Sequence, residues 1–172
     1  MGVLEYLRPV YVGLPPEQAG GLVYGLERAT VAWPELVDLS AKEWKEVGDD
    51  KLIGEYKPDF ARTAQYEMAG QFVFVTVRDE NTGELVGYYV GTLSNAIKNE
   101  GKVLSETGLY LAPEVRGFAA ARRLLGFVET VARALGCDIL DVSHRPTSPR
   151  IGKLYERLGF APVSVNYAKR LT

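Results

Sequence analysis

The residues best suited to bind an anion are the small ones that open a helix after Arg116. The segment from Val103 to Gly136, VLSETGLYLAPEVRGFAAARRLLGFVETVARALG, reads as a strand, a break at Ala112-Pro113 and a long helix. The first turn of this helix, Gly117 to Ala121, is almost bare of bulky side chains, which leaves several backbone N–H groups uncovered. Those groups and the helix dipole concentrate positive potential at one point. The sequence therefore predicts a phosphate-binding turn there.

Composition limits the class of protein. A chain of 172 residues predicts one domain, residues 1–172, with a sizeable core. Twenty basic against twenty-two acidic residues give no basic field for nonspecific nucleic-acid binding. One cysteine, Cys137, excludes an intrachain disulfide, and with one histidine it argues against a structural zinc site. No signal pattern and no apolar run near 18 residues is visible, so we expect a cytoplasmic protein without a membrane segment.

The amino-terminal part mixes weak strand signals with helical ones. Met1 to Thr30 allows a short strand or two without a defined register. Ala32 to Val47 has apolar residues near helical spacing and predicts one or two helices, with Ser40 capping the second piece. Asp59 to Ala69 predicts another short helix, which begins after Pro58 and is stopped by Gly70.

The middle of the chain changes to a strand period. Gln71 to Asp79 and Glu84 to Thr92 are rich in β-branched and aromatic residues, and the turn residues Glu80 to Gly83 separate them. This pattern predicts a β-hairpin. A polar loop from Ser94 to Lys102 and a strand from Val103 to Leu111 are expected next.

The carboxy-terminal part predicts a βαβ unit. The helix from Gly117 to Leu135 has an apolar stripe on one side, made of Phe118, Ala121, Leu125, Val128, Ala132 and Leu135. Gly136 stops it, and Cys137 to Ser143 predicts a strand parallel to the first. A short helix from Ile151 to Leu158 and one or two closing strands from Phe160 to Leu171 complete the expected order.

Three segments in this order resemble one family. LYLAPEVRGFAAARRLL, GCDILDVS and KLYERLGFAPV are similar to the GNAT superfamily of acetyl-CoA-dependent acyltransferases, especially to compact members carried by bacteriophages, and the resemblance covers about Glu84 to Leu171. It implies a mixed α/β (α+β) fold, with a central mixed, mostly antiparallel sheet, a splayed parallel strand pair and flanking helices. It also implies acetyl-CoA as the cofactor.

The resemblance assigns cofactor contacts residue by residue. The family's phosphate motif falls on Arg116, Ala119 and Ala121, and the middle position, a glycine in the family, is alanine here. It implies that main-chain groups near Leu109, Tyr110 and Leu111 pair with the pantetheine arm, and that an N–H there holds the thioester oxygen. Ser148 stands where many relatives have an asparagine that contacts the pantetheine. The expected diphosphate contacts are Arg116, Gly117, Phe118, Ala119, Ala120, Ala121 and Arg122.

The resemblance also implies the catalytic acid, but it leaves the base open. Tyr155, in KLYERLGF, occupies the place of the acid that protonates the departing CoA thiolate. Ser143 stands where many relatives have a glutamate base. The candidates to take the amine's proton are Glu106, Asp141 and His144, and a water chain to bulk solvent could replace any of them. His144 has the most suitable intrinsic pKa. Our hypothesis is that the base is Glu106 or His144.

The sequence thus predicts an N-acetyltransferase that moves an acetyl group from CoA to an amine by direct attack in a ternary complex. Two alternatives stay open: a phage-type enzyme of this fold that modifies a nucleic-acid base or its precursor, and a degenerate CoA-binding or structural module. The expected acceptor is a small-molecule or protein amine, and a homodimer is compatible with the sequence. Acidic residues that could attract such a cation are Glu35, Glu43, Glu46, Asp49 and Asp50.

Overall fold

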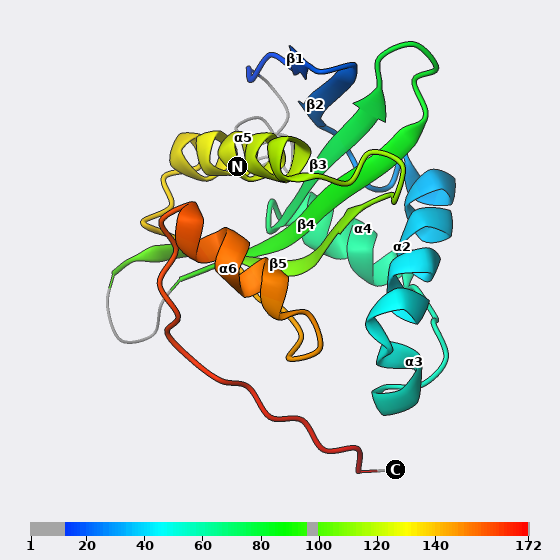
Figure 1. The fold of residues 1–172 in the computed structure, drawn as a ribbon, viewed down its shortest axis with the longest axis vertical. Helices are drawn as coiled ribbons and strands as arrows, with labels where there is room; N and C mark the ends of the chain where they lie inside the picture. The colour runs from blue at the N-terminus through cyan, green and yellow to red at the C-terminus, as the bar shows by residue number, and fades with distance from the viewer. Residues whose placement is uncertain (1–12, 96–99, 172) are drawn as a thin grey trace.

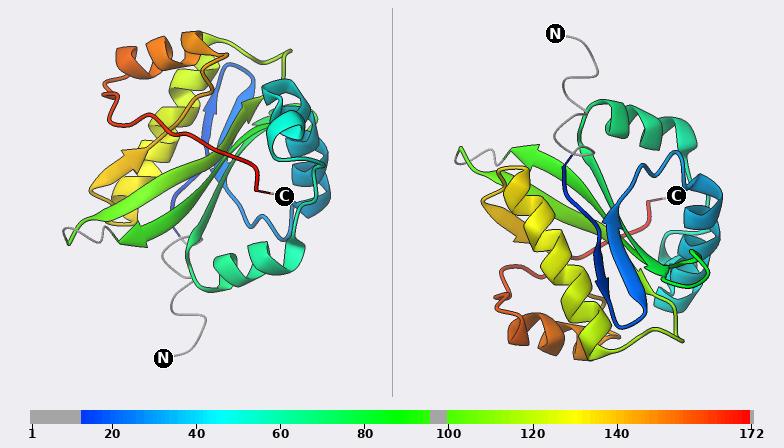
Figure 2. Two further views of the ribbon diagram at one scale, coloured as in Figure 1. Left: turned by 90° about the horizontal axis from the view of Figure 1, so that it is seen from below. Right: turned by 90° about the horizontal axis from the view of Figure 1, so that it is seen from above.

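The computed structural model describes residues 13–95 and 100–171, and a six-stranded sheet in the order β1-β2-β3-β4-β5-β6 forms its centre (Figure 1). The strands are β1 (Glu17–Ala19), β2 (Leu22–Leu26), β3 (Phe72–Asp79), β4 (Leu85–Asn95), β5 (Lys102–Leu111) and β6 (Ile139–Asp141). The helices are α2 (Trp33–Val47), α3 (Asp49–Leu52), α4 (Phe60–Met68), α5 (Phe118–Ala134) and α6 (Pro149–Arg157). Helices α2, α3 and α4 lie on one side of the sheet, and α5 and α6 on the other (Figure 2). No helix within these described ranges is long and apolar enough to cross a membrane.

The amino-terminal predictions are confirmed in part. Strands β1 and β2 form an antiparallel hairpin inside the stretch where a short strand or two was expected, while residues 1–12 of that stretch lie outside the described residues. The prediction that Ser40 caps a second helical piece is wrong, because α2 is one continuous helix. Leu36 and Leu39 are buried on one face of it, so packing carries the helix through the polar residues between them. The Ser40 hydroxyl instead hydrogen-bonds to the hydroxyl of Tyr56.

The predicted helix and hairpin of the middle segment are confirmed. The Asp59 carboxylate caps α4 by accepting from the Arg62 N–H at 2.9 Å. Asp79 closes the β3–β4 turn, because its carboxylate accepts from the N–H groups of Asn81 and Thr82, both at 2.9 Å. The prediction started the polar loop after β4 too early, at Ser94. Strand β4 extends to Asn95, which pairs with the first residue of β5, and residues 96–99 lie outside the described residues.

The parallel pair of the βαβ unit is confirmed, but its second strand is shorter than predicted. Strand β6 pairs with β5 only from Val103 to Ser105, so the rest of β5 continues alone on that side. Among the described strands, none covers this edge from Glu106 to Leu111. A bulge also interrupts β5, since Gly91 of β4 faces Glu106 while Val90 faces Gly108. The extra residue between them is Thr107, and such a bulge redirects the neighbouring side chains.

The prediction of closing strands from Phe160 to Leu171 is wrong. This segment has no strand pairing and runs away from α6 as an extended tail (Figure 1). Its apolar residues alternate as they do in a strand, yet Val163 and Tyr167 are 84% and 93% exposed. Alternation specifies a strand only where a sheet edge takes up its hydrogen bonds, and the tail meets none here.

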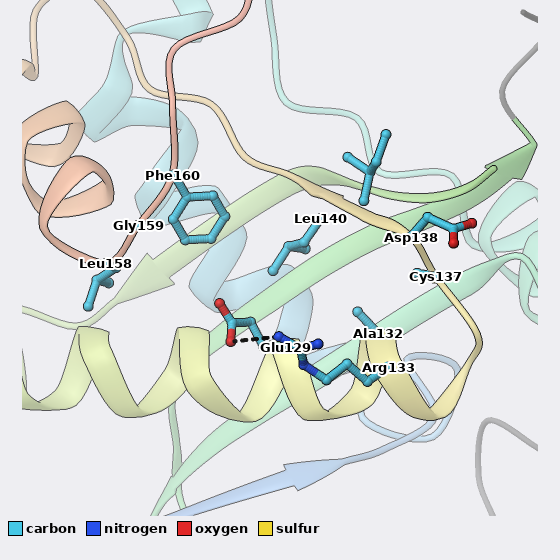
Figure 3. Close-up of a pocket in the computed structure, with 10 residues that line it drawn as sticks. Glu129, Ala132, Arg133, Cys137, Asp138, Leu140, Leu158, Gly159 and Phe160 are labelled. Carbon is cyan, nitrogen blue, oxygen red and sulfur yellow. Dashed lines mark ion pairs between the residues drawn. The ribbon is translucent and has the colours of Figure 1, made fainter. Parts of the chain in front are cut away.

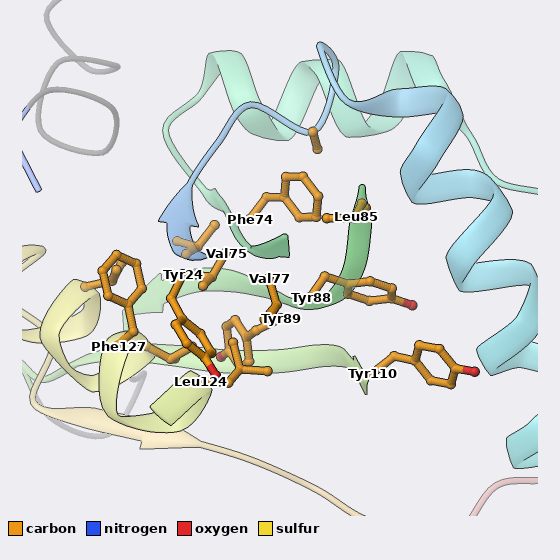
Figure 4. Packing of buried hydrophobic residues seen from close by; sticks show 14 of the residues in the cluster. Tyr24, Phe74, Val75, Val77, Leu85, Tyr88, Tyr89, Tyr110, Leu124 and Phe127 are labelled. Carbon is orange, nitrogen blue, oxygen red and sulfur yellow. The ribbon is translucent and has the colours of Figure 1, made fainter. Parts of the chain in front are cut away.

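The core lies on both faces of β3 and β4. Tyr24, Tyr89 and Phe127 are buried toward α5, whereas Phe74 and Tyr88 face the side of α2 and α4 (Figure 4). The predicted apolar stripe of α5 is largely buried. Phe118 is the exception at 52% exposed, because it is the first residue of the helix and lies before the buried turns.

Strands β4 and β5 approach closely at Gly87, and this gives a stability prediction. A Cβ at Gly87 would lie 2.6 Å from Leu111 Cδ2 and 2.9 Å from the Tyr110 carbonyl oxygen. We expect Gly87→Ala to lower the free energy of unfolding by about 1–3 kcal/mol, because a well-packed core must shift to admit the methyl group. Chemical denaturation measures this. The control is Gly126→Ala in α5, whose Cβ meets nothing within 4 Å and should raise stability by up to about 1 kcal/mol. Equal effects would contradict the close approach.

Candidate active site

The start of α5 is open, as its small residues suggest. Gly117 precedes the helix in an extended conformation, and the helix has no side-chain cap and no acidic residue in its first turn. A Cβ at Gly117 would meet nothing within 4 Å. Among the described residues, no side chain caps the N–H groups of Phe118, Ala119 and Ala120, while the Ala121 N–H donates to the Gly117 carbonyl oxygen at 3.0 Å. This arrangement fits the diphosphate of a CoA molecule.

The side chain of Arg116 is engaged elsewhere. Its guanidinium donates to the Leu111 carbonyl oxygen at 2.8 Å and forms an ion pair with Glu46 of α2 at 2.6 Å. It also lies over the ring of Tyr110, 5.3 Å from the centroid. The Arg116 ion pair lowers the pKa of the Glu46 carboxyl. Arg116 thus joins α2 to the end of β5, and a direct contact with a phosphate stays a prediction.

A groove runs along α5 and α6 from this helix start. It has a volume of about 580 Å³, and its lining includes Phe118 and Arg122 of α5 and Arg157 of α6. A second hollow of about 220 Å³ lies farther along α5, between Glu129, Leu140 and Phe160 (Figure 3). The two arginines give the first groove positive charge beside the open helix start. The predicted contact of Arg122 with an anionic cofactor stays a prediction.

The open edge of β5 lies just before this helix. Leu109 is half-buried, and the Glu43 carboxyl lies against Gly108, the residue before it. The Tyr110 hydroxyl donates to Glu46 at 3.2 Å, and the Leu111 carbonyl is taken by Arg116. Of the three residues predicted to face the pantetheine arm, Leu109 is therefore the one beside the Glu43 carboxyl. The Leu109 N–H is a suitable donor to an acyl oxygen.

Tyr155 lies near the same edge, on α6. Its side chain is 6% exposed, and its hydroxyl donates to the Ser143 carbonyl oxygen at 3.1 Å. Burial raises the pKa of Tyr155, and the nearby carboxyls of Glu106 and Glu43 raise it further. The phenol therefore keeps its proton at neutral pH. The structure brings the predicted acid beside one predicted base.

Glu106 and His144, the two predicted bases, differ in their surroundings. The Glu106 carboxylate accepts from the Ser143 N–H at 2.8 Å and from its hydroxyl at 3.2 Å. Burial raises the pKa of Glu106 in spite of these hydrogen bonds. His144 is exposed, and its ring is tilted by 56° to that of Tyr155, with the ring centroids 6.4 Å apart. The imidazole lies against Gly152, where a Cβ would be 2.6 Å from Nε2. Asp141, at the end of β6, is exposed.

The loop between β6 and α6 is fixed by α3. Arg145 of this loop forms an ion pair with the buried Asp49 at 2.5 Å. Ser148 precedes α6, and its N–H donates to the Arg145 carbonyl oxygen at 2.8 Å, while its hydroxyl makes no cap bond. The Ser148 hydroxyl thus has no role in capping α6, and its predicted contact with the pantetheine stays a prediction.

Glu43 is a site residue that the sequence did not identify. We expected it only as one of several acids that could attract an amine. Its carboxyl accepts from the Tyr88 hydroxyl, and it lies against Gly108, where a Cβ would be 3.5 Å from Oε2. Burial raises its pKa to about 7, and nearby Glu106 raises it as well. Nothing in the sequence distinguishes Glu43 from the neighbouring acidic residues, so only its position against β5 identifies it as a site residue.

The fold agrees with that of known acetyltransferases. The model of the acetyltransferase (GNAT) family matches residues 33–160. A search of curated proteins finds no match in sequence. A solved aminoglycoside acetyltransferase from an uncultured soil metagenomic sample superposes with a TM-score of 0.71 at 17% identity, covering 89% of this chain and 100% of that one.

Two further structures show the same fold. The acetyltransferase AAC(6')-Iy, solved with a bisubstrate analogue of CoA, has a TM-score of 0.66 at 16% identity over 88% of this chain and 99% of its own. A ribosomal-protein-alanine N-acetyltransferase from Brucella melitensis biovar Abortus has a TM-score of 0.66 at 16% identity over 88% and 100%. With the family match over most of its length, an open α5 start and a free β5 edge, the chain belongs to the acetyltransferase (GNAT) family and is an acyltransferase with acetyl-CoA as its cofactor.

Proposed function

We propose that this protein is an N-acetyltransferase in which an amine attacks the acetyl group of CoA directly, within a ternary complex. The observation that carries the proposal is the start of α5, which no side chain of the described residues caps. It lies next to the part of β5 that β6 leaves uncovered. An anion at the helix start and an extended chain along the strand edge are what these two features bind best. Tyr155 and Glu106 lie near that edge.

Each residue has a defined task in this proposal. Acetyl-CoA supplies an acetyl group activated as a thioester. The N–H groups from Gly117 to Ala120 hold the diphosphate, since the Ala121 N–H already donates to the Gly117 carbonyl. The Leu109 N–H donates to the acyl oxygen as negative charge gathers on it, which is worth about 3 kcal/mol for one well-placed donor. Tyr155 gives its proton to the departing sulfur, and positioning the amine supplies much of the remaining acceleration.

The proton acceptor in this proposal is Glu106 or His144, and the pH dependence identifies it. A base works when it has lost its proton, so kcat/KM should rise with pH. Because burial raises the pKa of Glu106, the rising limb that this residue causes should have its midpoint above the pKa of ~4.3 of an ordinary glutamate. We expect Glu106→Gln or His144→Gln to flatten this limb in the pH profile. If the double variant keeps it, neither is the base, and Glu43 is the next carboxyl to test.

The acceptor we propose is a cationic amine, either a small molecule or a protein amino group. Glu43, Glu46 and the buried Asp49 lie on the α2–α3 side of the sheet. Glu46 and Asp49 are paired with Arg116 and Arg145, so Glu43 is the carboxyl of the three that favours a positive charge there. The near-balanced composition counts against a nucleic-acid base as the acceptor. We place the reaction in the cytoplasm of a bacterium or phage-infected cell. A single domain and a homodimer both stay predictions.

Two measurements test the proposal. Calorimetry should detect acetyl-CoA binding to the full chain, which separates a CoA-dependent protein from a purely structural one. Release of free CoA thiol with a panel of amines, and not without an amine, should then show transfer. Binding without release for any amine in the panel would favour a degenerate CoA-binding module instead.

A further inference from the structure

The Glu43 carboxyl lies beside the donor that the proposed function assigns to the acyl oxygen, the Leu109 N–H. A Cβ at Gly108, the residue before Leu109, would lie 3.5 Å from Glu43 Oε2, on the uncovered part of β5 immediately after the Thr107 bulge. The bulge matters because Glu106 and Gly108 would share one face in a regular strand. Here Glu106 bonds to Ser143 on the side of α6, whereas Gly108 lies against Glu43 and Tyr88 on the side of α2.

A backbone N–H has one hydrogen and serves one strong acceptor at a time. A carboxylate is a stronger acceptor than the oxygen of a thioester, because its bond is charge-assisted. Any acyl group that uses the Leu109 N–H must therefore displace Glu43. CoA without an acyl group has no oxygen for that position and leaves the Glu43 carboxyl in place.

The surroundings of Glu43 let it move without leaving its neighbours. Tyr88 of β4 donates to it, and this hydroxyl can follow a carboxyl that turns away from Leu109. The other titratable groups around it are Glu106 of β5, Asp49 of α3, Tyr56 of the segment before α4, and Tyr155 of α6. Gly108 leaves no side chain between the carboxyl and the strand, so the acyl group and Glu43 share one space.

We propose that Glu43 closes the acyl site of the free protein by holding the Leu109 N–H, and that an acyl-CoA, unlike CoA, must displace it on binding. This inference rests on the proposed function and adds a specificity-determining residue to it. Acetyl-CoA therefore binds less tightly than it would without the Glu43 carboxyl, whereas the affinity for CoA is unaffected. Removing the carboxyl should therefore favour acetyl-CoA over CoA in binding.

The test compares two dissociation constants, Kd for CoA and Kd for acetyl-CoA, by calorimetry at pH 8. In Glu43→Ala we expect the ratio of the CoA constant to the acetyl-CoA constant to rise about tenfold over wild type, because a charge-assisted competitor is gone. Kd for CoA alone should stay within about twofold. Glu43→Gln keeps a neutral, weaker acceptor and should give an intermediate ratio.

The matched control is Glu46→Ala, which removes the same charge one turn later on α2 without touching Leu109. Both constants should change together in it, so the ratio should stay at the wild-type value. An unchanged ratio in Glu43→Ala, with both ligands binding, overturns the inference and leaves the proposed function intact. Wild-type protein that binds neither ligand overturns the proposed function itself. If Glu43→Ala does not fold, the Glu43→Gln ratio decides.

Discussion

An aspartate in place of Ala119 is expected to abolish acetyl-CoA binding while making the protein more stable. Ala119 is the second residue of α5 and is exposed. A carboxylate there would face the position of the diphosphate, and the repulsion, together with the loss of open N–H groups, should weaken Kd by at least ~100-fold. The same charge favours the helix dipole and should raise the free energy of unfolding by about 0.3–1 kcal/mol.

In this variant the affinity for acetyl-CoA should fall while the free energy of unfolding rises. Misfolding would lower both, so it cannot explain this result. The control is Ala61→Asp, also an exposed second residue of a helix, α4, whose first turn has no acidic residue either. Because the Asp59 carboxylate already caps α4, the gain in thermal stability should be smaller there, while acetyl-CoA binding should stay unchanged. Calorimetry and thermal unfolding measure the two effects. Acetyl-CoA binding to Ala119→Asp within about threefold of wild type would show that the diphosphate lies elsewhere.

Ala119 also offers a graded version of the experiment. The family motif has glycine at this position, and the extra methyl group narrows the approach to the first-turn N–H groups. Ala119→Gly should therefore bind acetyl-CoA more tightly, although it loses up to about 1 kcal/mol of helix stability. Binding and stability again move in opposite directions.

The parts of the fold that the sequence predicted are those whose signals are local. The β3–β4 hairpin follows from β-branched runs around a turn in which Asp79 binds the following N–H groups, and α5 follows from an apolar stripe that ends at Gly136. Helix α4 begins at the predicted place because Asp59 caps it. In each case the residues that specify the element lie within it.

The failures involve partners that lie far away in the chain. Alternation in the tail suggested strands, but a strand needs an edge, and residues 161–171 pair with none in the described structure. Ser40 suggests a cap because serine is common at that position. The helix continues through it because Leu36 and Leu39 are buried on one face, which depends on contacts that the sequence does not show. The short length of β6 could not be predicted either, since it depends on where α6 and its loop take over.

The candidate site shows the same division. The open α5 start and Tyr155 carry short sequence signals, and the structure places both near the free edge of β5. Glu43 carries none, because its position depends on a bulge in a strand more than sixty residues later. The salt bridge of Arg116 to Glu46 is equally long-range, and it changes what a sequence motif suggests about that arginine.

Replacing Tyr155 with phenylalanine is expected to lower kcat by about 10²–10⁴-fold with little change in Kd for acetyl-CoA, because a positioned acid is lost while the ring remains. The structural loss is small, since the hydroxyl makes one hydrogen bond, to the Ser143 carbonyl, worth about 1 kcal/mol. Burial raises the pKa of Tyr155, so its ionisation should not produce a falling limb in the kcat profile between pH 6 and 9.

A buried tyrosine of strand β2 provides the control for this substitution. Tyr24 is 1% exposed, and its hydroxyl finds no hydrogen-bond partner in the described part of the chain, so Tyr24→Phe should keep both kcat and stability. A thiol-release assay at saturating amine compares the two variants. If Tyr155→Phe keeps more than about a third of wild-type kcat, the leaving thiolate obtains its proton from water, because an acid that contributes to the transition state cannot be removed at so small a cost.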